Sequence, residues 1–254
     1  MIVDAHCHVD LYKNLEDVLK RAREVGVCGV IAVSMDVESM GRTLNIADAS
    51  EAMVKPALGL HPLAVQRDFN VDSGLEDALT MLRRNVSKIV AVGEVGLDHY
   101  QSQEREVQLK QEVVFRAMLD FADENRLPVI IHSLKAERRV FNILEEYGDL
   151  AVVIHWFTGP AELIEKGVRR GYYFSVTPAV TYSSKVRRVA RRVSLELLLC
   201  ESDGPVEYRG VVGEPADCRM VVEKIADVKG LKASSVEDAL LENVKRVFKR
   251  VNCA

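Results

Sequence analysis

The sequence predicts an α/β fold, a (β/α)8 TIM barrel, because of its length and the way its segments alternate. The chain has 254 residues, and a barrel of eight strand–helix units needs about 250. Short apolar runs rich in β-branched residues recur along the whole chain, and amphipathic segments separate them. This alternation is typical of βαβ units and a parallel sheet. Because no linker or change of composition divides the chain, we expect residues 1–254 to form a single domain.

Eight strands are expected from these apolar runs. They lie near residues 2–8, 28–34, 54–60, 89–95, 128–133, 150–157, 172–177 and 196–202. The runs at 89–92 and 129–131 are apolar on consecutive residues, as in strands that are buried on both faces.

The segments between the strands predict helices. Residues 104–125 place Val107, Val114, Met118 and Phe121 on one stripe, and residues 185–193 repeat apolar side chains at helical spacing. Residues 204–215 follow the eighth strand and are rich in glycine and proline. We therefore expect an irregular loop over the mouth of the barrel there, not a domain boundary.

Composition narrows the class of protein. The formal net charge of −4 disfavours a protein that wraps nucleic acid along its backbone. The five cysteines are odd in number and none forms a CxxC pair, which disfavours a secreted disulfide framework. We expect no signal peptide, because the first residues lack a basic segment followed by an apolar run, and no apolar run reaches about 20 residues. We expect a cytoplasmic protein that does not enter the membrane, with no obligate protein partner evident.

Polar side chains gather where the predicted strands end. They are His6 and His8 on the first strand, His61 on the third, Glu94 on the fourth, His132 on the fifth, His155 on the sixth and Asp203 on the eighth. In a parallel barrel these ends converge on one face, where the active sites of barrel enzymes lie.

The histidines have a structural alternative to metal binding. His6 and His8 are two residues apart, so on a strand both imidazoles point to the same side. As core filling they would bury ring nitrogens that need partners, which favours metal ligation. His132 and His155 alone could be hydrogen-bonded core histidines, but the pair on the first strand favours ligation for them too.

The two carboxylates could instead cap turns. Glu94 lies between two glycines and Asp203 precedes Gly204. As a ligand, one carboxylate can give an oxygen to each of two cations, and imidazoles with carboxylates suit zinc, manganese or a related divalent ion. Four histidines and two carboxylates exceed one tetrahedral site but suffice for two metals with positions open to water.

Six motifs in this order resemble the TatD family of metal-dependent deoxyribonucleases, which belongs to the amidohydrolase superfamily. They are Asp4-Ala5-His6-Cys7-His8, Gly59-Leu60-His61-Pro62, Gly93-Glu94-Val95-Gly96-Leu97-Asp98, His132-Ser133, His155-Trp156-Phe157-Thr158-Gly159 and Glu201-Ser202-Asp203-Gly204-Pro205. The segment from Glu242 to Phe248 resembles a further C-terminal element of the family, so the resemblance covers nearly the whole chain.

The resemblance implies a barrel with two divalent metal ions: Zn, Mg or Mn. It assigns His6, His8 and Asp203 to one metal, His132 and His155 to the other, and Glu94 to a bridge between them. His61 would touch the substrate phosphate or the attacking water. The implied activity is hydrolysis of DNA phosphodiesters, with DNA ends or single strands as the substrate.

Further roles follow as hypotheses. Asp203 is the candidate for the group that orients the attacking water and takes its proton, and Glu94 and His61 complete the catalytic set. Lys135, just past His132, is a candidate substrate contact, and Tyr182 and Tyr208 could stack on a base. The basic face at 185–192 is interpreted as a solvated outer surface.

Two other functions stay open. One keeps the metals and changes the bond to another ester, a lactone or a C–N linkage; the absence of a lysine at the fourth strand end favours the Glu94-bridged branch instead. The other is a barrel that binds nucleic acid or protein without turnover. Six polar groups facing one pocket would be poorly satisfied without metal, which argues against it.

Overall fold

The computed structural model describes residues 1–50 and 52–251, and within them eight parallel strands form one sheet. The strands are β1 (Ile2–Cys7), β2 (Val27–Val33), β3 (Val54–Leu58), β4 (Ala91–Gly96), β5 (Val129–His132), β6 (Val152–Ile154), β7 (Tyr173–Val176) and β8 (Leu198–Cys200). Each strand pairs with the next along the chain, and β8 returns to contact β1. The predicted TIM barrel is confirmed.

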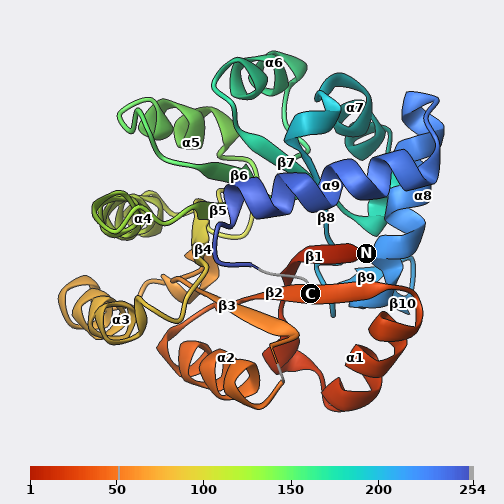
Figure 1. Ribbon diagram of the computed structural model, residues 1–254. Helices are drawn as coiled ribbons and strands as arrows, with labels where there is room; N and C mark the ends of the chain where they lie inside the picture. The colour runs from red at the N-terminus through yellow and green to blue at the C-terminus, as the bar shows by residue number, and fades with distance from the viewer. Residues whose placement is uncertain (51, 252–254) are drawn as a thin grey trace.

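Helices surround this barrel (Figure 1). They are α1 (Leu15–Glu24), α2 (Val37–Ala49), α3 (Val71–Asn85), α4 (Arg105–Glu124), α5 (Glu137–Leu144), α6 (Ala161–Arg169), α7 (Ser184–Arg192), α8 (Cys218–Lys229) and α9 (Ala233–Val247). The predicted helices at 104–125 and 185–193 correspond to α4 and α7, and Val107, Val114, Met118 and Phe121 of α4 are all buried.

Two apolar cores follow from the alternation of side chains along the strands. In β2, Val30 and Ala32 belong to the core between strands and helices, whereas Ile31 and Val33 point into the barrel. This is the two-residue period of a strand buried on both faces. It explains why the strands read as continuous apolar runs.

Helix α9 closes the amino-terminal end of the barrel (Figure 1). Val244, Val247 and Phe248 pack against the inner side chains of the strands. Asn243, also buried, donates from Nδ2 to the carbonyl oxygens of Leu195 and Leu198, both at 2.8 Å. With these side chains the helix fills this end of the barrel, and the polar side chains predicted from the sequence gather at the opposite end.

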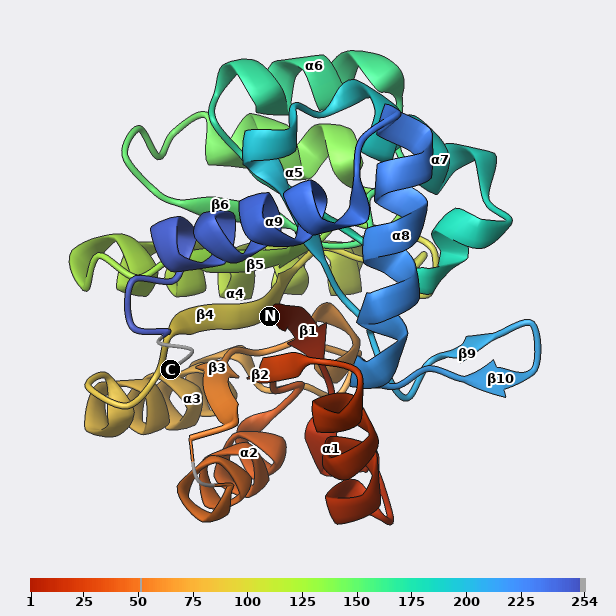
Figure 2. The ribbon, with the colours of Figure 1, turned by 45° about the vertical axis from the view of Figure 1, so that its right-hand side comes forward.

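The stretch at 204–215 differs from the predicted irregular loop. It contains a short hairpin of β9 (Glu207–Tyr208) and β10 (Val211–Val212), which projects from the barrel (Figure 2). Arg209 and Gly210 form its two-residue turn with φ of 55° and 84°, and a turn with two positive φ angles suits the twist of a hairpin. The sequence did not predict this hairpin, because each of its strands is only two residues long.

None of the helices in the described part of the chain is both long enough and apolar enough to cross a membrane.

Candidate metal centre

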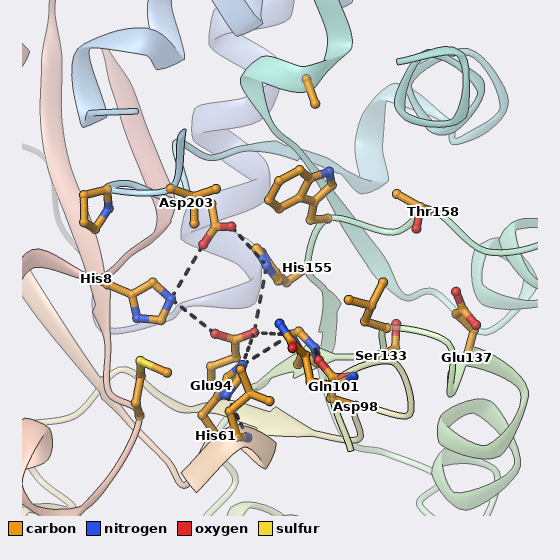
Figure 3. A pocket seen from close by; sticks show the side chains of 18 of the residues that line it. His8, His61, Glu94, Asp98, Gln101, Ser133, Glu137, His155, Thr158 and Asp203 are labelled. Carbon is orange, nitrogen blue, oxygen red and sulfur yellow. Dashed lines mark hydrogen bonds and ion pairs between the residues drawn. The ribbon is translucent and has the colours of Figure 1, made fainter. Parts of the chain in front are cut away.

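A cavity of about 650 Å³ opens at the carboxyl ends of the strands (Figure 3). Its polar lining includes His8, His61, Glu94, His132, His155 and Asp203. Apolar side chains complete the walls, among them Leu11, Met35, Leu63 and Val206.

The strands bring the predicted residues to this cavity as parallel topology requires. His6 lies in β1 and His8 follows it, Glu94 lies in β4, and His132 is the last residue of β5. Three more come from the loops that continue the strands: His61 after β3, His155 directly after β6 and Asp203 after β8. All seven side chains lie together.

The two oxygens of Glu94 face different histidines (Figure 3). Oε2 lies 3.2 Å from Nε2 of His6 and 3.4 Å from Nε2 of His8. Oε1 lies 2.8 Å from Nδ1 of His132, 3.5 Å from Nε2 of His61 and 3.9 Å from Nε2 of His155. One carboxylate therefore stands between two sets of imidazoles.

Asp203 faces the same space from the opposite side. Its Oδ1 lies 3.3 Å from Nε2 of His6 and 3.6 Å from Nε2 of His8, and Oδ2 lies 3.7 Å from Nε2 of His155. The backbone N–H of Asp203 donates to the carbonyl of His6 at 3.0 Å. Its φ of 48° is in the left-handed region, which aspartate tolerates better than most residues.

The arrangement suits divalent cations. Nε2 of His6 and Nε2 of His8 are only 3.4 Å apart, and both face the carboxylates. Within the described residues, ligand atoms close enough to share an ion occur in three groups: His6–His8–Asp203, His6–His155–Glu201 and His61–Glu94–His132. Because two imidazole nitrogens and two carboxylates converge there, a shared cation or proton is needed to satisfy them.

Charge coupling keeps both carboxylates ionised. Burial raises the pKa of Glu94, but His61, His6 and His155 outweigh it and hold this pKa well below its usual range. Burial likewise raises the pKa of Asp203, and His155 and His6 bring it below normal. Ionised carboxylates are the form that binds metal.

The neighbouring carboxylates raise the pKa values of two of the histidines. Burial lowers the pKa of His6, but the charges of Glu94 and Asp203 raise it well above normal. Burial also lowers the pKa of His132, yet hydrogen bonds to Asp98 and Glu94 raise it to about 9. A metal ion would compete with these protons for the ring nitrogens.

Two further carboxylates, not predicted as site residues, orient the histidines. Oδ2 of Asp98 lies 3.0 Å from Nε2 of His132, and Oε2 of Glu201 lies 3.0 Å from Nδ1 of His155. Glu201 also accepts from the backbone N–H of Trp156 at 3.0 Å. The sequence did carry a signal for both residues. Asp98 lies in the same motif as the candidate ligand Glu94, and Glu201 lies in the same motif as Asp203.

Gly96 allows β4 and β5 to approach each other at the centre. Its φ is 145°, and a Cβ atom at this position would overlap with the carbonyl oxygen of His132. That carbonyl accepts from the N–H of Leu97 at 3.1 Å. Only glycine fits here, and the close approach brings His132 beside Glu94.

Of the three predicted substrate contacts outside the metal centre, only Tyr182 has a side chain that lines the cavity and is not buried. Lys135 is exposed and does not line the cavity, although Ser133 and Leu134 do, so its role stays a prediction. Tyr182 lines the cavity, and the guanidinium of Arg209 lies 4.4 Å from its ring centre. Tyr208 is buried and its hydroxyl donates to the carbonyl of Ser202, so its ring is not free to stack on a base.

Comparison with known proteins identifies the family. A family model described as TatD related DNase matches residues 3–249. The chain belongs to this family. The resemblance seen in the sequence motifs is therefore confirmed, and with it the prediction of a metal-dependent hydrolase.

Relatives match over nearly their full length. The chain is 31% identical over 265 residues to the uncharacterized metal-dependent hydrolase YabD of Bacillus subtilis, covering 99% of this chain and 100% of that protein. It is 28% identical over 263 residues to human deoxyribonuclease TATDN3, covering 98% and 95%. The crystal structure of the TatD homolog YJJV from Escherichia coli superposes with a TM-score of 0.88 at 29% identity, covering 98% of each chain.

Proposed function

We propose that this protein hydrolyses phosphodiester bonds of DNA at a strand end, using water activated by two divalent metal ions. The proposal of two metal ions is supported by one observation: the two oxygens of Glu94 face separate sets of histidines. In this proposal His6, His8 and Asp203 would hold one ion, His132 and His155 would hold the other, and Glu94 would be shared by both. Zn, Mg or Mn fits this nitrogen and oxygen donor set.

Metal ions held there would make a water acidic enough to supply hydroxide near neutral pH and would offset negative charge on the phosphate. The protein's own groups do the rest. Asp203, kept ionised by His155 and His6, takes the proton of the attacking water. His61 lines the cavity with its Nε2 3.5 Å from Oε1 of Glu94, and in this proposal it donates to a phosphate oxygen.

Two features support DNA ends as the substrate. A cavity of about 650 Å³ is of the size that holds a small ligand, and so accommodates a terminal nucleotide better than a continuous duplex. Trp156 and Tyr182 both line it, and aromatic rings of this kind stack on nucleobases. The name of the human relative, a deoxyribonuclease, supports DNA as the substrate.

The test is hydrolysis of end-labelled single-stranded DNA with Mg²⁺ or Mn²⁺, by the wild type and by two variants. Glu94→Ala should lose both bound metal and nucleotide release. Asp203→Asn should lower kcat by at least about a hundredfold, within the range of general-base catalysis, and change KM much less. Metal content measured beside activity separates the two effects.

Three results would change the proposal. Wild-type turnover by Asp203→Asn with metal bound would remove the base assignment. Bound metal without DNA cleavage would favour a hydrolase of another ester, a lactone or a C–N bond. Neither metal nor activity would favour a barrel that only binds nucleic acid or protein.

A further inference from the structure

The cavity extends beyond the metal centre to a second polar wall. Ser133, Thr158 and Glu137 line the side away from Asp203 and His8 (Figure 3). Glu137 is the first residue of α5, and Ser133 and Thr158 follow β5 and β6. The proposed chemistry at the metals uses none of these three side chains.

Glu137 differs from the charged residues beside it. Arg138 pairs with Glu162 and Arg139 pairs with Glu112, on the outer surface. Over residues 1–50 and 52–251, the carboxylate of Glu137 has neither an ion pair nor a hydrogen bond. An unpaired negative charge therefore faces a cavity that is proposed to bind a polyanion.

The stem of the Glu137 side chain packs against the loop after β6. A Cβ atom at Gly159 would come within 2.8 Å of Cγ of Glu137, so the glutamate stem lies directly against the backbone of Gly159. The carbonyl of Gly159 in turn accepts from Arg188 at 2.7 Å. The loop after β6 thus supports the orientation of Glu137.

A carboxylate at this wall accepts hydrogen bonds and repels anions. A second phosphate carries a charge of about −1.5 to −2 near neutral pH, and repulsion between like charges is strong in a partly enclosed site. A hydroxyl group, by contrast, can donate to the carboxylate. Ser133 and Thr158 offer hydroxyls on the same wall that can complete such a network.

We propose that Glu137, with Ser133 and Thr158, binds the terminal hydroxyl of the nucleotide being released, so that hydroxyl-terminated ends are preferred over phosphate-terminated ends. This rests on the proposed DNA-end activity and adds its specificity. Trp156 and Tyr182 line the cavity too, and in this proposal they contact the base while Glu137 contacts the sugar end.

The experiment compares matched single-stranded oligonucleotides that carry a hydroxyl or a phosphate at the attacked end. The wild type should show a kcat/KM at least about tenfold higher for the hydroxyl end, since one close like-charge repulsion is worth that much or more. Glu137→Gln should bring the two rates close together, chiefly by accelerating cleavage of the phosphate end. Simple structural damage would not accelerate any substrate.

Glu162→Gln is the matched control, because Glu162 is exposed on α6 and absent from the cavity lining. It should keep the wild-type preference. Equal rates on both ends in the wild type, or an unchanged preference in Glu137→Gln, would refute the inference while DNA cleavage itself stands. A preference that follows the terminal base instead of the terminal group would also refute it. No cleavage of any oligonucleotide would refute the proposed function and this inference together.

Discussion

Glu201 offers the most informative single substitution near the metal centre. Its side chain is fully buried, with Oε2 3.0 Å from Nδ1 of His155 and Oε1 accepting from the N–H of Trp156. Glu201→Gln keeps the size and one acceptor. If that acceptor stays on Trp156, the new NH₂ group faces Nδ1 of His155, and two donors then point at each other.

The ring of His155 can relieve this conflict only by moving its proton to Nε2. That nitrogen is the one that faces Asp203 at 3.7 Å and Glu94 at 3.9 Å, and a protonated Nε2 cannot bind metal. Loss of such an outer partner typically weakens metal affinity or activity by about 10–100-fold. This corresponds to about 1.4–2.8 kcal/mol, at about 1.4 kcal/mol per tenfold change.

Metal affinity is the quantity to measure, by competition between the protein and a chromogenic chelator for Zn²⁺ or Mn²⁺. Glu196→Gln, on the exposed turn before β8, is the control and should bind as the wild type does. Thermal unfolding checks that Glu201→Gln folds. If the folded Glu201→Gln protein binds both ions within about twofold of wild type, the orienting role of Glu201 is wrong.

The remaining predictions concern stability. Asn243→Ala leaves the carbonyls of Leu195 and Leu198 without their donor, so urea unfolding should show a loss of about 2–4 kcal/mol, and a loss no larger than that of exposed Asp238→Ala would contradict it. Gly96→Ala should destabilise by roughly 3 kcal/mol or more, because the new methyl overlaps with the carbonyl of His132 at a φ that alanine avoids. The matched Gly41→Ala, where nothing lies within 4 Å in helix α2, should instead stabilise by about 0.5–1 kcal/mol; equal effects of the two would refute the steric argument. Removing metal with a chelator should lower Tm, since free ion at 100 times its Kd adds about 2.7 kcal/mol to the folded state, and a Tm independent of Mn²⁺ would speak against ion binding in the native fold.

Much of the fold and the convergence of the site could be predicted from the sequence. Parallel topology requires that the ends of β1, β4, β5, β6 and β8 meet, so His6, Glu94, His132 and Asp203 had to come together once the eight strands were recognised. The apolar runs were clear because the strands are buried on both faces. The boundaries of β8 were less clear, since a 3-10 turn at Leu195–Leu197 occupies the start of the predicted strand.

Details that depend on local backbone direction could not be predicted. Lys135 stays a predicted substrate contact, but its backbone turns at a φ of 58° and its side chain is exposed outside the cavity lining, which the spacing from His132 does not indicate. The supporting roles of Asp98 and Glu201 depend on which ring nitrogen of His132 and His155 faces the centre. That orientation arises from packing around the rings, and residue spacing does not encode it.

The most direct test of the proposed centre is an equilibrium titration with Mn²⁺, observed by the paramagnetic resonance of free ion, for the wild type and Glu94→Gln. Because each oxygen of Glu94 faces a different set of histidines, we expect two ions per chain and weaker binding of both in the variant. A single ion in the wild type, or a variant that weakens only one of two sites, would contradict the bridging role of Glu94.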